Sequence, residues 1–315
     1  MNLKLVPDNT NIGFVRMRYL AFALTVLLTI GSIALLVTKG LNLGVDFKGG
    51  LTMEVAFSAP PPLDRLREEV DSLRVGQSAL QEFGNARTIL IRLPLPDGGQ
   101  DAVQKVVAKV QADLKAKYGN VSFRRTESVS GKVSGELIRK GALAVLLSMA
   151  AVALFTWIRF EWHFGVSTVV ALVHDVTVTM GFFALTQLEF DLNVVAAVLT
   201  IIGYSLNDKV VIDDRIRENL RKYRSMDIGH IIDLSVNETL PRTVMTSLAM
   251  IVALTAMLLL GPDVIFGFTA AMLLGIVVGT YSSIFVSSSL LIALGVKSRA
   301  APVETSRGER VTRRA

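Results

Sequence analysis

Six long apolar runs constrain this chain of 315 residues more than any other feature of its sequence. A helix needs about 20 apolar residues to cross the ~30 Å core of a bilayer. The runs cover residues 19–38, 141–158, 164–187, 192–212, 243–262 and 268–294. Titratable side chains interrupt only the third run, with His174 and Asp175, and the fourth, with Asp208 and Lys209. The sequence therefore predicts a polytopic α-helical membrane protein with six transmembrane helices.

The composition excludes several kinds of site. Hydrophobic residues make up 51% of the chain and charged residues 19%, which is more apolar than a typical soluble domain. Cysteine is absent, so the chain has no disulfide, thiolate metal site or cysteine nucleophile. Three histidines are too few for a metal centre built from histidine. The net charge of +6 lies beside the apolar runs, so we expect no nucleic-acid partner.

Basic residues in the short loops and tails predict the orientation, because they gather on the cytoplasmic side of a membrane. They lie in the N-terminal segment 1–18, at Arg159, in the loop 213–242 and in the tail 295–315. Six spans place all of these on one side. We therefore expect both termini in the cytoplasm and an external segment at 39–140. We also expect the first span to remain as an uncleaved anchor and residues 300–315 to be disordered.

The external segment has the pattern of a small α+β domain. Strands are predicted at 51–57, 77–83, 88–93 and 121–129, and helices at 63–73 and from a cap at Asp101. Alternating apolar residues mark the strands, and Gly84-Asn85 marks a hairpin. The order βαββαβ predicts a ferredoxin-like domain after the first helix. It contains no histidine and no glycine-rich phosphate loop, so we expect it to bind or dock rather than to catalyse a reaction.

Asp208 is the strongest candidate functional residue, because ionisable groups at membrane depth are costly and usually functional. It lies 16 residues into the fourth run, which is about 24 Å from the external end at ~1.5 Å per residue. Arg242 begins the fifth run at a similar depth on an antiparallel helix. The two side chains could meet, and the carboxyl could take up and release a proton. Alternatively, both are interfacial, and Arg242 extends to the headgroups.

Three further features have a structural and a functional interpretation. His174 and Asp175 are either a proton relay or static interhelical contacts. Gly275 and Gly279, spaced with other small residues, predict a face for close helix packing. The stretch 213–240 is basic and then amphipathic, so we expect it to lie on the membrane surface.

Four stretches of the chain match motifs of one known family. The longest runs from Gly203 to Asp208, as GYSLND, and ends with DRIREN at 214–219. GVDFKGG at 44–50 matches the pattern G-[IV]-D-F-x-G-G. The pairs His174-Asp175 and Arg242-Thr243 stand at the expected places in the third and fifth spans. Over about residues 10–296 the chain resembles the SecF members of the SecD/SecF protein-export family, within the RND transporter superfamily.

This resemblance implies an RND-type half-transporter in the bacterial inner membrane. It would pair with SecD and use the proton gradient to draw an unfolded preprotein from the SecYEG channel on the external side, with YajC and YidC as further partners. Protons would be the coupling ion, and we expect neither a cofactor nor enzymatic activity.

The resemblance also implies roles for individual residues. It assigns Asp208 and Arg242 to the proton pathway, with His174, Asp175 and Asn207 as candidate relay residues. Structural roles are expected at Gly44, Asp46, Gly49, Gly50, Asp214, Arg215, Arg217, Glu218 and Asn219. Lys209 departs from the family, which often has a small hydroxyl or apolar residue there. This cation would act on Asp208 or pair with Asp213.

Other functions fit the sequence less well. An intramembrane aspartyl protease needs G-x-G-D, whereas Ser205 and Asn207 occupy the corresponding places before Asp208. The P-loop pattern for ATP is absent. An RND exporter of lipid or drug is disfavoured by the small external domain. A passive scaffold that only stabilises the export channel stays open as an alternative.

Overall fold

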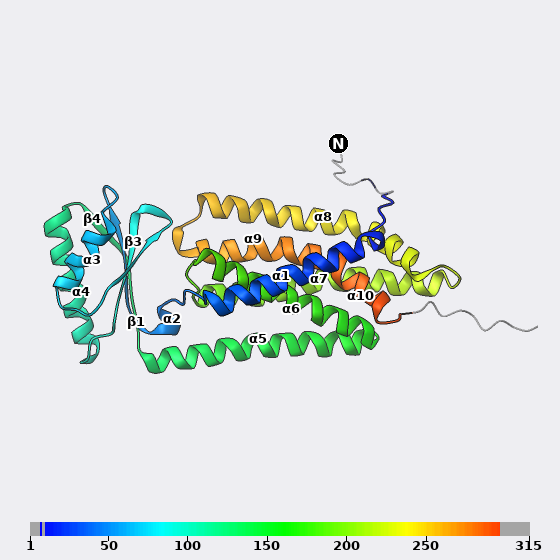
Figure 1. Cartoon of the computed structure of the whole chain (residues 1–315), viewed down its shortest axis with the longest axis horizontal. Coiled ribbons are helices and arrows are strands. Elements are labelled where there is room, and N and C mark those ends of the chain that lie inside the picture. The colour runs from blue at the N-terminus through cyan, green and yellow to red at the C-terminus, as the bar shows by residue number, and fades with distance from the viewer. Residues whose placement is uncertain (1–6, 8–9, 297–315) are drawn as a thin grey trace, which may run out of the picture.

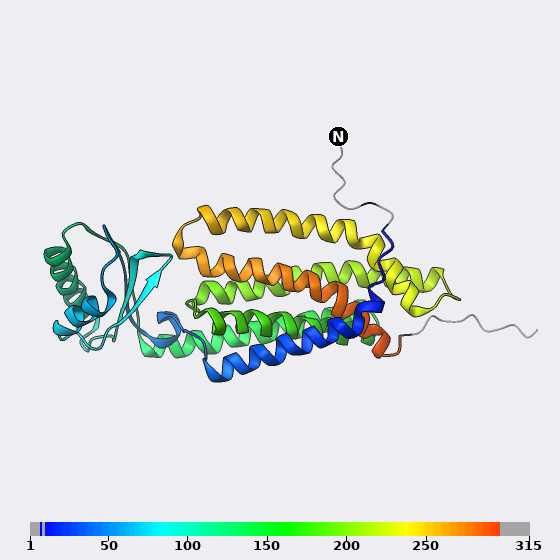
Figure 2. The same cartoon turned by 45° about the horizontal axis from the view of Figure 1, so that its top comes forward.

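The computed structural model describes residues 7 and 10–296 and divides them into two parts (Figure 1). A small domain built on a sheet stands at one end of an elongated helix bundle, and Figure 2 shows the same separation from a second direction. We call the end of the bundle next to the sheet the domain end and the opposite end the distal end. The segment 300–315, predicted to be disordered, lies outside the described residues.

Within the described chain, six helices are long and apolar enough to cross a membrane, which confirms the predicted number. They are α1 (Arg18–Thr38), α5 (Gly131–Arg159), α6 (Trp162–Thr186), α7 (Leu192–Lys222), α8 (Ile228–Leu260) and α9 (Phe266–Tyr281), which continues through a π-helical turn (Ser282–Ser287) into α10 (Ser288–Ala293). Single 3-10 turns at Val15–Met17 and Asp263–Ile265 precede α1 and α9. Helices α5, α7 and α8 extend beyond the predicted apolar spans, because the polar turns at their ends remain helical.

Helices α6, α7 and α9–α10 form the centre of the bundle, and α1, α5 and α8 form its flanks. In the most apolar window of each helix, 56% of residues are buried in α6, 44% in α7 and 61% in α9–α10, against 11% in α1, 6% in α5 and 17% in α8. Apolar side chains left exposed on the flanking helices suit a lipid environment. Polar side chains on the central helices are therefore the ones enclosed by protein.

Glycines let the central helices approach closely. A Cβ on Gly275 would lie 2.4 Å from the Ile201 side chain, and a Cβ on Gly279 would lie 3.0 Å from Ser205 Oγ. The predicted packing face on α9 is confirmed, and its partner is α7. Gly181 plays the same part between α6 and α1, where its Cβ would lie 2.7 Å from the Cα of Ser32.

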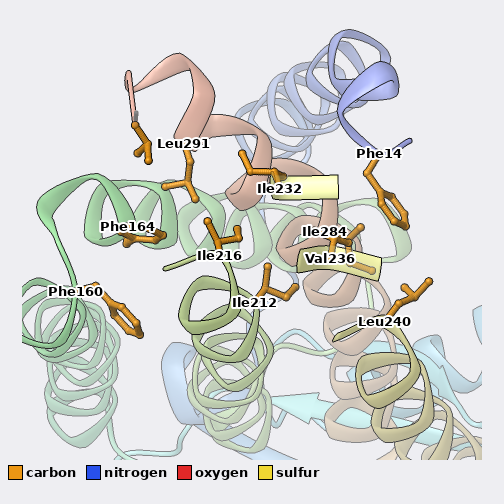
Figure 3. Packing of buried hydrophobic residues seen from close by; sticks show 11 residues of the cluster. Phe14, Phe160, Phe164, Ile212, Ile216, Ile232, Val236, Leu240, Ile284 and Leu291 are labelled. Atoms are coloured by element: carbon orange, nitrogen blue, oxygen red, sulfur yellow. The ribbon is translucent and has the colours of Figure 1, made fainter. Parts of the chain in front are cut away.

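At the distal end, α7 and α8 continue as an antiparallel helical pair (Figure 1). The predicted loop 213–242 is therefore helical except for the connection at 223–227. The prediction that its apolar face lies on the membrane surface is wrong. Ile232 and Val236 of α8 are buried in one cluster with Ile216 of α7 (Figure 3), so that face is covered by protein.

The sheet domain has the predicted order βαββαβ. Its elements are β1 (Gly50–Phe57), α3 (Leu63–Ser72), β2 (Ala79–Phe83), β3 (Asn85–Leu93), α4 (Gly99–Tyr118) and β4 (Val121–Val129). All strand pairs are antiparallel in the order β2-β3-β1-β4, which confirms the ferredoxin-like fold. Helix α4 begins at Gly99, with Gly98 as its N-cap, so Asp101 is not the cap but an acidic residue of the first turn.

The two faces of the sheet have different partners. Apolar side chains from alternate positions of β1 and β3 pack against α3 and α4 to form the domain core. Thr52 and Glu54 point to the opposite face, where they are buried and line a cavity of about 100 Å³ together with Asp46 and Glu189. The sheet is therefore seated on the domain end of the bundle.

Two glycines shape the connection from the bundle to β1. The short helix α2 (Val45–Lys48) is followed by Gly49 and Gly50, with φ angles of 73° and 122°. Residues other than glycine rarely adopt positive φ angles such as these. A Cβ on Gly50 would also lie 2.8 Å from the carbonyl oxygen of Leu93. Before α2, a Cβ on Gly44 would lie 2.9 Å from Glu189 Oε1, at the end of a flexible side chain. The requirement for glycine is therefore strict at Gly49 and Gly50.

Polar contacts complete this junction. Asp46 Oδ2 accepts a hydrogen bond of 3.0 Å from the backbone N–H of Leu192, at the first turn of α7. Arg92 of β3 lies 3.0 Å from Glu189 and donates a second hydrogen bond of 3.0 Å to Asn42. Burial raises the pKa of the Glu189 carboxyl, and the nearby Arg92 guanidinium offsets this only in part. The orientation of the domain thus depends on charges at the start of α7.

Replacement of Gly181 by Ala should destabilise the protein by about 1–3 kcal/mol, because the new methyl overlaps α1. The matched control is Gly31→Ala, within α1 itself, where a Cβ meets nothing within 4 Å. That change should be neutral or stabilising by up to about 1 kcal/mol, since alanine favours helix. Unfolding of the purified protein in mixed detergent measures both. Equal stability of the two variants would contradict the close approach of α1 and α6.

Docking of the sheet domain should strengthen as the pH falls. A carboxyl whose pKa is raised in the docked state takes up a proton on docking, so docking is favoured as the pH drops through that raised value towards the ordinary value of Glu189, 4.5. The chain has no cysteine, so two cysteines can be introduced, one in β2 and one in α9. Spin labels attached to them report the distance between the two elements. Glu189→Gln should reduce the pH dependence, and Glu68→Gln, on the exposed surface of α3, should retain it. Stronger docking at neutral pH would contradict the assignment.

Candidate functional site

A buried ion pair between α6 and α7 organises the polar groups of the bundle. Lys209 Nζ lies 3.0 Å from Asp175 Oδ2, and neither side chain has exposed surface. Ser205 Oγ donates to the same carboxylate oxygen at 2.6 Å, and Ser282 Oγ donates at 2.9 Å. Lys209 in turn donates to both serine hydroxyls. Both charges are therefore bonded within the protein, as burial among apolar helices requires.

Three helices bring these groups together. Asp175 comes from α6, Ser205 and Lys209 lie one turn apart on α7, and Ser282 opens the π-helical turn after α9. Such turns are often found at functional sites. The missing side chain of Gly279 lets α9 lie against Ser205. The predicted small-residue face thus positions the ion pair as well as the helices.

Sequence reasoning placed Lys209 beside Asp208 or in a pair with Asp213, whereas its ion pair in the structure is with Asp175. His174, the neighbour of Asp175, lies on another side of α6. Its Nδ1 is 2.9 Å from the Thr29 hydroxyl of α1. Both residues of the predicted His-Asp pair therefore connect helices, but they contact different partners.

Asp208 is buried on α7, with 3% of its surface exposed. Its Oδ2 has no hydrogen-bond partner among the described residues. Arg242 lies on α8 with an exposed side chain, and its charge and that of Lys209 both act on the Asp208 carboxyl. Across the part of the chain that the structure describes, no hydrogen bond or ion pair joins Asp208 directly to Arg242. Asn207, the third candidate of this motif, is exposed.

Asp213 is a buried carboxyl that sequence reasoning did not select as a site. Only 1% of its surface is exposed, and Thr168 of α6 donates to its Oδ2 at 3.5 Å. Its Oδ1 has no partner within residues 10–296. Asp213 lies four residues after Lys209, which places both side chains on one face of α7. This spacing was the signal in the sequence that could have identified Asp213.

The motif residues after Asp213 join α7 to its neighbours at the distal end. Arg215 binds Glu238 of α8 and Glu218 at 2.6 Å each. Asn219 donates to Glu238 at 2.7 Å and to Ser235 at 3.0 Å. The remaining contacts go to Arg159 of α5: Asp214 pairs with its side chain at 3.2 Å and Arg217 donates to its carbonyl at 3.2 Å. These contacts make this end of α7 a structural anchor.

The central polar groups of the bundle are of kinds that can exchange protons. Among the described residues, no group of three histidine or acidic side chains is placed to hold a metal ion. The groups at the centre of the bundle are carboxyls, hydroxyls and one ammonium. Such groups can exchange protons along a hydrogen-bonded path.

Comparison with known proteins gives one consistent family. Residues 109–297 match the family described as "Protein export membrane protein SecD/SecF, C-terminal", and residues 34–61 match the "SecD/SecF GG Motif". The chain is 40% identical to "Protein translocase subunit SecF" of Cereibacter sphaeroides, over 97% of this chain and 96% of the relative. The protein of the same name from Rickettsia bellii is 39% identical, over 92% and 95%. These relatives are transport components.

Solved structures agree with the fold. The crystal structure of SecDF, a translocon-associated membrane protein from Thermus thermophilus, matches with a TM-score of 0.84 and 32% identity over 92% of this chain. A structure titled SecDF in super-membrane-facing form matches with a TM-score of 0.65 and 30% identity over 91%. The chain spans 39% of the length of either solved chain. On the family match and the identity to its relatives, this multi-pass membrane protein belongs to the SecD/SecF family of protein-export membrane proteins.

Proposed function

We propose that this chain uses the proton gradient to promote preprotein export, with Asp208 as the group that binds and releases the proton. The observation that carries the proposal is the buried Asp208 carboxyl, whose Oδ2 lacks a partner in the described chain. An ionised carboxyl in that position is costly, and protonation removes the cost. A change in proton supply therefore changes the energy of this part of α7.

Arg242 is the second member of the proposed site. Its charge acts on Asp208 from α8, although the two are not bonded in this state. When Asp208 is ionised, attraction favours approach of the two helices, and when it is neutral that attraction is lost. One proton that crosses the full membrane supplies about 2.3 kcal/mol per 100 mV, so a few protons are enough to shift the packing of two helices.

Helix α7 connects this site to the sheet domain. Asp208 lies 16 residues after Leu192, or about 24 Å along the helix. The first turn of α7 is held by Asp46, and Glu189, three residues before Leu192, is paired with Arg92 of the sheet. We propose that repacking of α7 against α8 alters this junction and so moves the domain.

We place the chain in the bacterial inner membrane with both termini in the cytoplasm and the sheet domain outside. The distribution of basic residues supports this orientation. The proposed partners are SecD, the SecYEG channel with YajC and YidC, and an unfolded preprotein that the sheet domain assists on the external side. The proposed coupling ion is the proton, without a cofactor.

Replacement of Asp208 by Asn should abolish the stimulation of export by a proton gradient, because the amide keeps the shape of the side chain but cannot bind and release a proton. The measurement is post-initiation preprotein translocation into inverted vesicles that carry an imposed gradient. Co-purification with SecD checks assembly. Glu161→Gln is the control, since Glu161 is exposed before α6 and its side chain makes no cap hydrogen bond, so this variant should retain stimulation.

The two outcomes separate the proposal from its main alternative. Normal assembly without gradient stimulation supports proton coupling at Asp208. Full stimulation in the Asp208→Asn variant would contradict it and favour a passive scaffold that stabilises the export channel.

A further inference from the structure

The buried charges around Lys209 do not balance unless one of the two carboxyls that it can reach, Asp175 or Asp213, holds a proton. Asp175 and Asp213 are both buried, with 0% and 1% of their surface exposed, and Lys209 is the cation between them at 1%. One ammonium can neutralise one carboxylate. A second ionised carboxyl in this apolar setting would cost several kcal/mol. Since Lys209 is bonded to Asp175, the neutral carboxyl in this state is Asp213.

Lys209 can reach either carboxyl without movement of a helix. Asp213 follows it by one turn on α7, and residues at this spacing have Cβ atoms about 5–6 Å apart. The flexible four-carbon stem of lysine spans such a distance by rotation of its own bonds. Both residues of α7 have their partners on α6, since Asp175 contacts Lys209 and Thr168 contacts Asp213.

We propose that Asp175, Lys209 and Asp213 form a second proton-binding site, in which the Lys209 ammonium pairs with one carboxylate and the proton resides on the other. In the observed state Asp175 is ionised and Asp213 is protonated. When a proton binds Asp175, the ammonium is released and moves to Asp213, whose proton leaves. The ammonium keeps its three protons throughout. The starting state returns when the proton on Asp175 passes to Asp213 as the ammonium moves back, so each full cycle moves one proton from the Asp175 side to the Asp213 side.

The other titratable and charged groups on the neighbouring helices have their own contacts, so the exchange involves only Asp175, Lys209 and Asp213. On α6, His174 is directed to Thr29 of α1. On α7, Asp208 is the other buried acid, and Arg242 is the cation that acts on it from α8. Arg159 of α5 is paired with Asp214. The described residues of α9 and α10 carry no charge.

Hydroxyls of α6 and the π-helical turn line the way from Asp175 towards the distal end. Ser282 is bonded to Asp175, and Ser287 donates to Ser167 at 3.4 Å, close in sequence to Thr168. Asp213 follows Lys209 by one turn of α7 towards the distal end, and its partner Thr168 lies seven residues nearer the distal end of α6 than Asp175. Transfer of a proton from Asp175 to Asp213 therefore runs inward, in the direction of the proton gradient. Only this statement of direction rests on the proposed function.

Infrared difference spectroscopy of the full chain with SecD in lipid vesicles tests the site directly, because a protonated carboxyl has its own carbonyl band. Asp213→Asn should remove one buried carboxylic acid band at neutral pH. Asp175→Asn should remove the same band, because the freed Lys209 then pairs with Asp213 and ionises it. Asp214→Asn should leave the band unchanged, since that residue is exposed and paired with Arg159.

The outcomes distinguish this site from the one at Asp208. Retention of the band in Asp213→Asn, or in Asp175→Asn, would overturn the exchange, whatever happens to export. Asp208→Asn should keep the band that Asp213→Asn removes. If Asp208→Asn leaves export unchanged while the bands behave as expected, the proposed function at Asp208 fails and the proton site at Asp213 stands.

Discussion

The cost of charge inside an apolar helix bundle governs the structure around the centre of this protein. Asp175 and Lys209 are tolerated because each neutralises the other and two serines bond to Asp175 Oδ2 and to Lys209, although Asp175 Oδ1 has no partner among the described residues. Replacement of Lys209 alone would leave the Asp175 carboxylate buried without its cation, and loss of one partner of a buried pair typically costs 3–5 kcal/mol. Three helices must therefore stay in register to within a hydrogen bond. The glycines of α9, which lie against Ile201 and Ser205, make that register sterically possible.

Local patterns in the sequence predicted most of the fold. Runs of about 20 apolar residues gave the six spans because length and hydropathy alone decide whether a helix can cross a bilayer. Alternation in β1 and β3 gave the strands, and the order of elements gave the ferredoxin-like domain. Local patterns did not predict that α7 and α8 continue beyond their apolar runs as a packed pair of helices. There the apolar face packs on a partner helix, and a surface helix would have a similar pattern.

The candidate site was predicted less completely, because its contacts depend on how helices are rotated against one another. Asp208 stood out by its depth alone. The partner of Lys209 did not, since Asp175 is 34 residues away and the sequence does not say which face of α6 meets α7. Asp213 was predicted only as a possible partner of Lys209 and not as a buried site residue, for a related reason. It lies next to the polar motif that begins at Asp214 and looks like part of a solvated helix end, whereas the structure encloses it against Thr168.

Helix α7 carries the elements that any coupling between the proton and the sheet domain requires. Its first turn is bonded to Asp46 of the glycine motif, its middle holds Asp208 and Lys209, and its last turns are anchored to α8 and α5. A helix fixed at one end and loaded with titratable groups at its centre transmits a change in packing along its axis, because its backbone hydrogen bonds keep it stiff. The other end of α7 is the junction, where burial raises the pKa of the Glu189 carboxyl and the Arg92 guanidinium offsets this only in part. In the proposed mechanism a change in the packing of α7 reaches the sheet at this junction, through Asp46 and through Glu189, which is paired with Arg92.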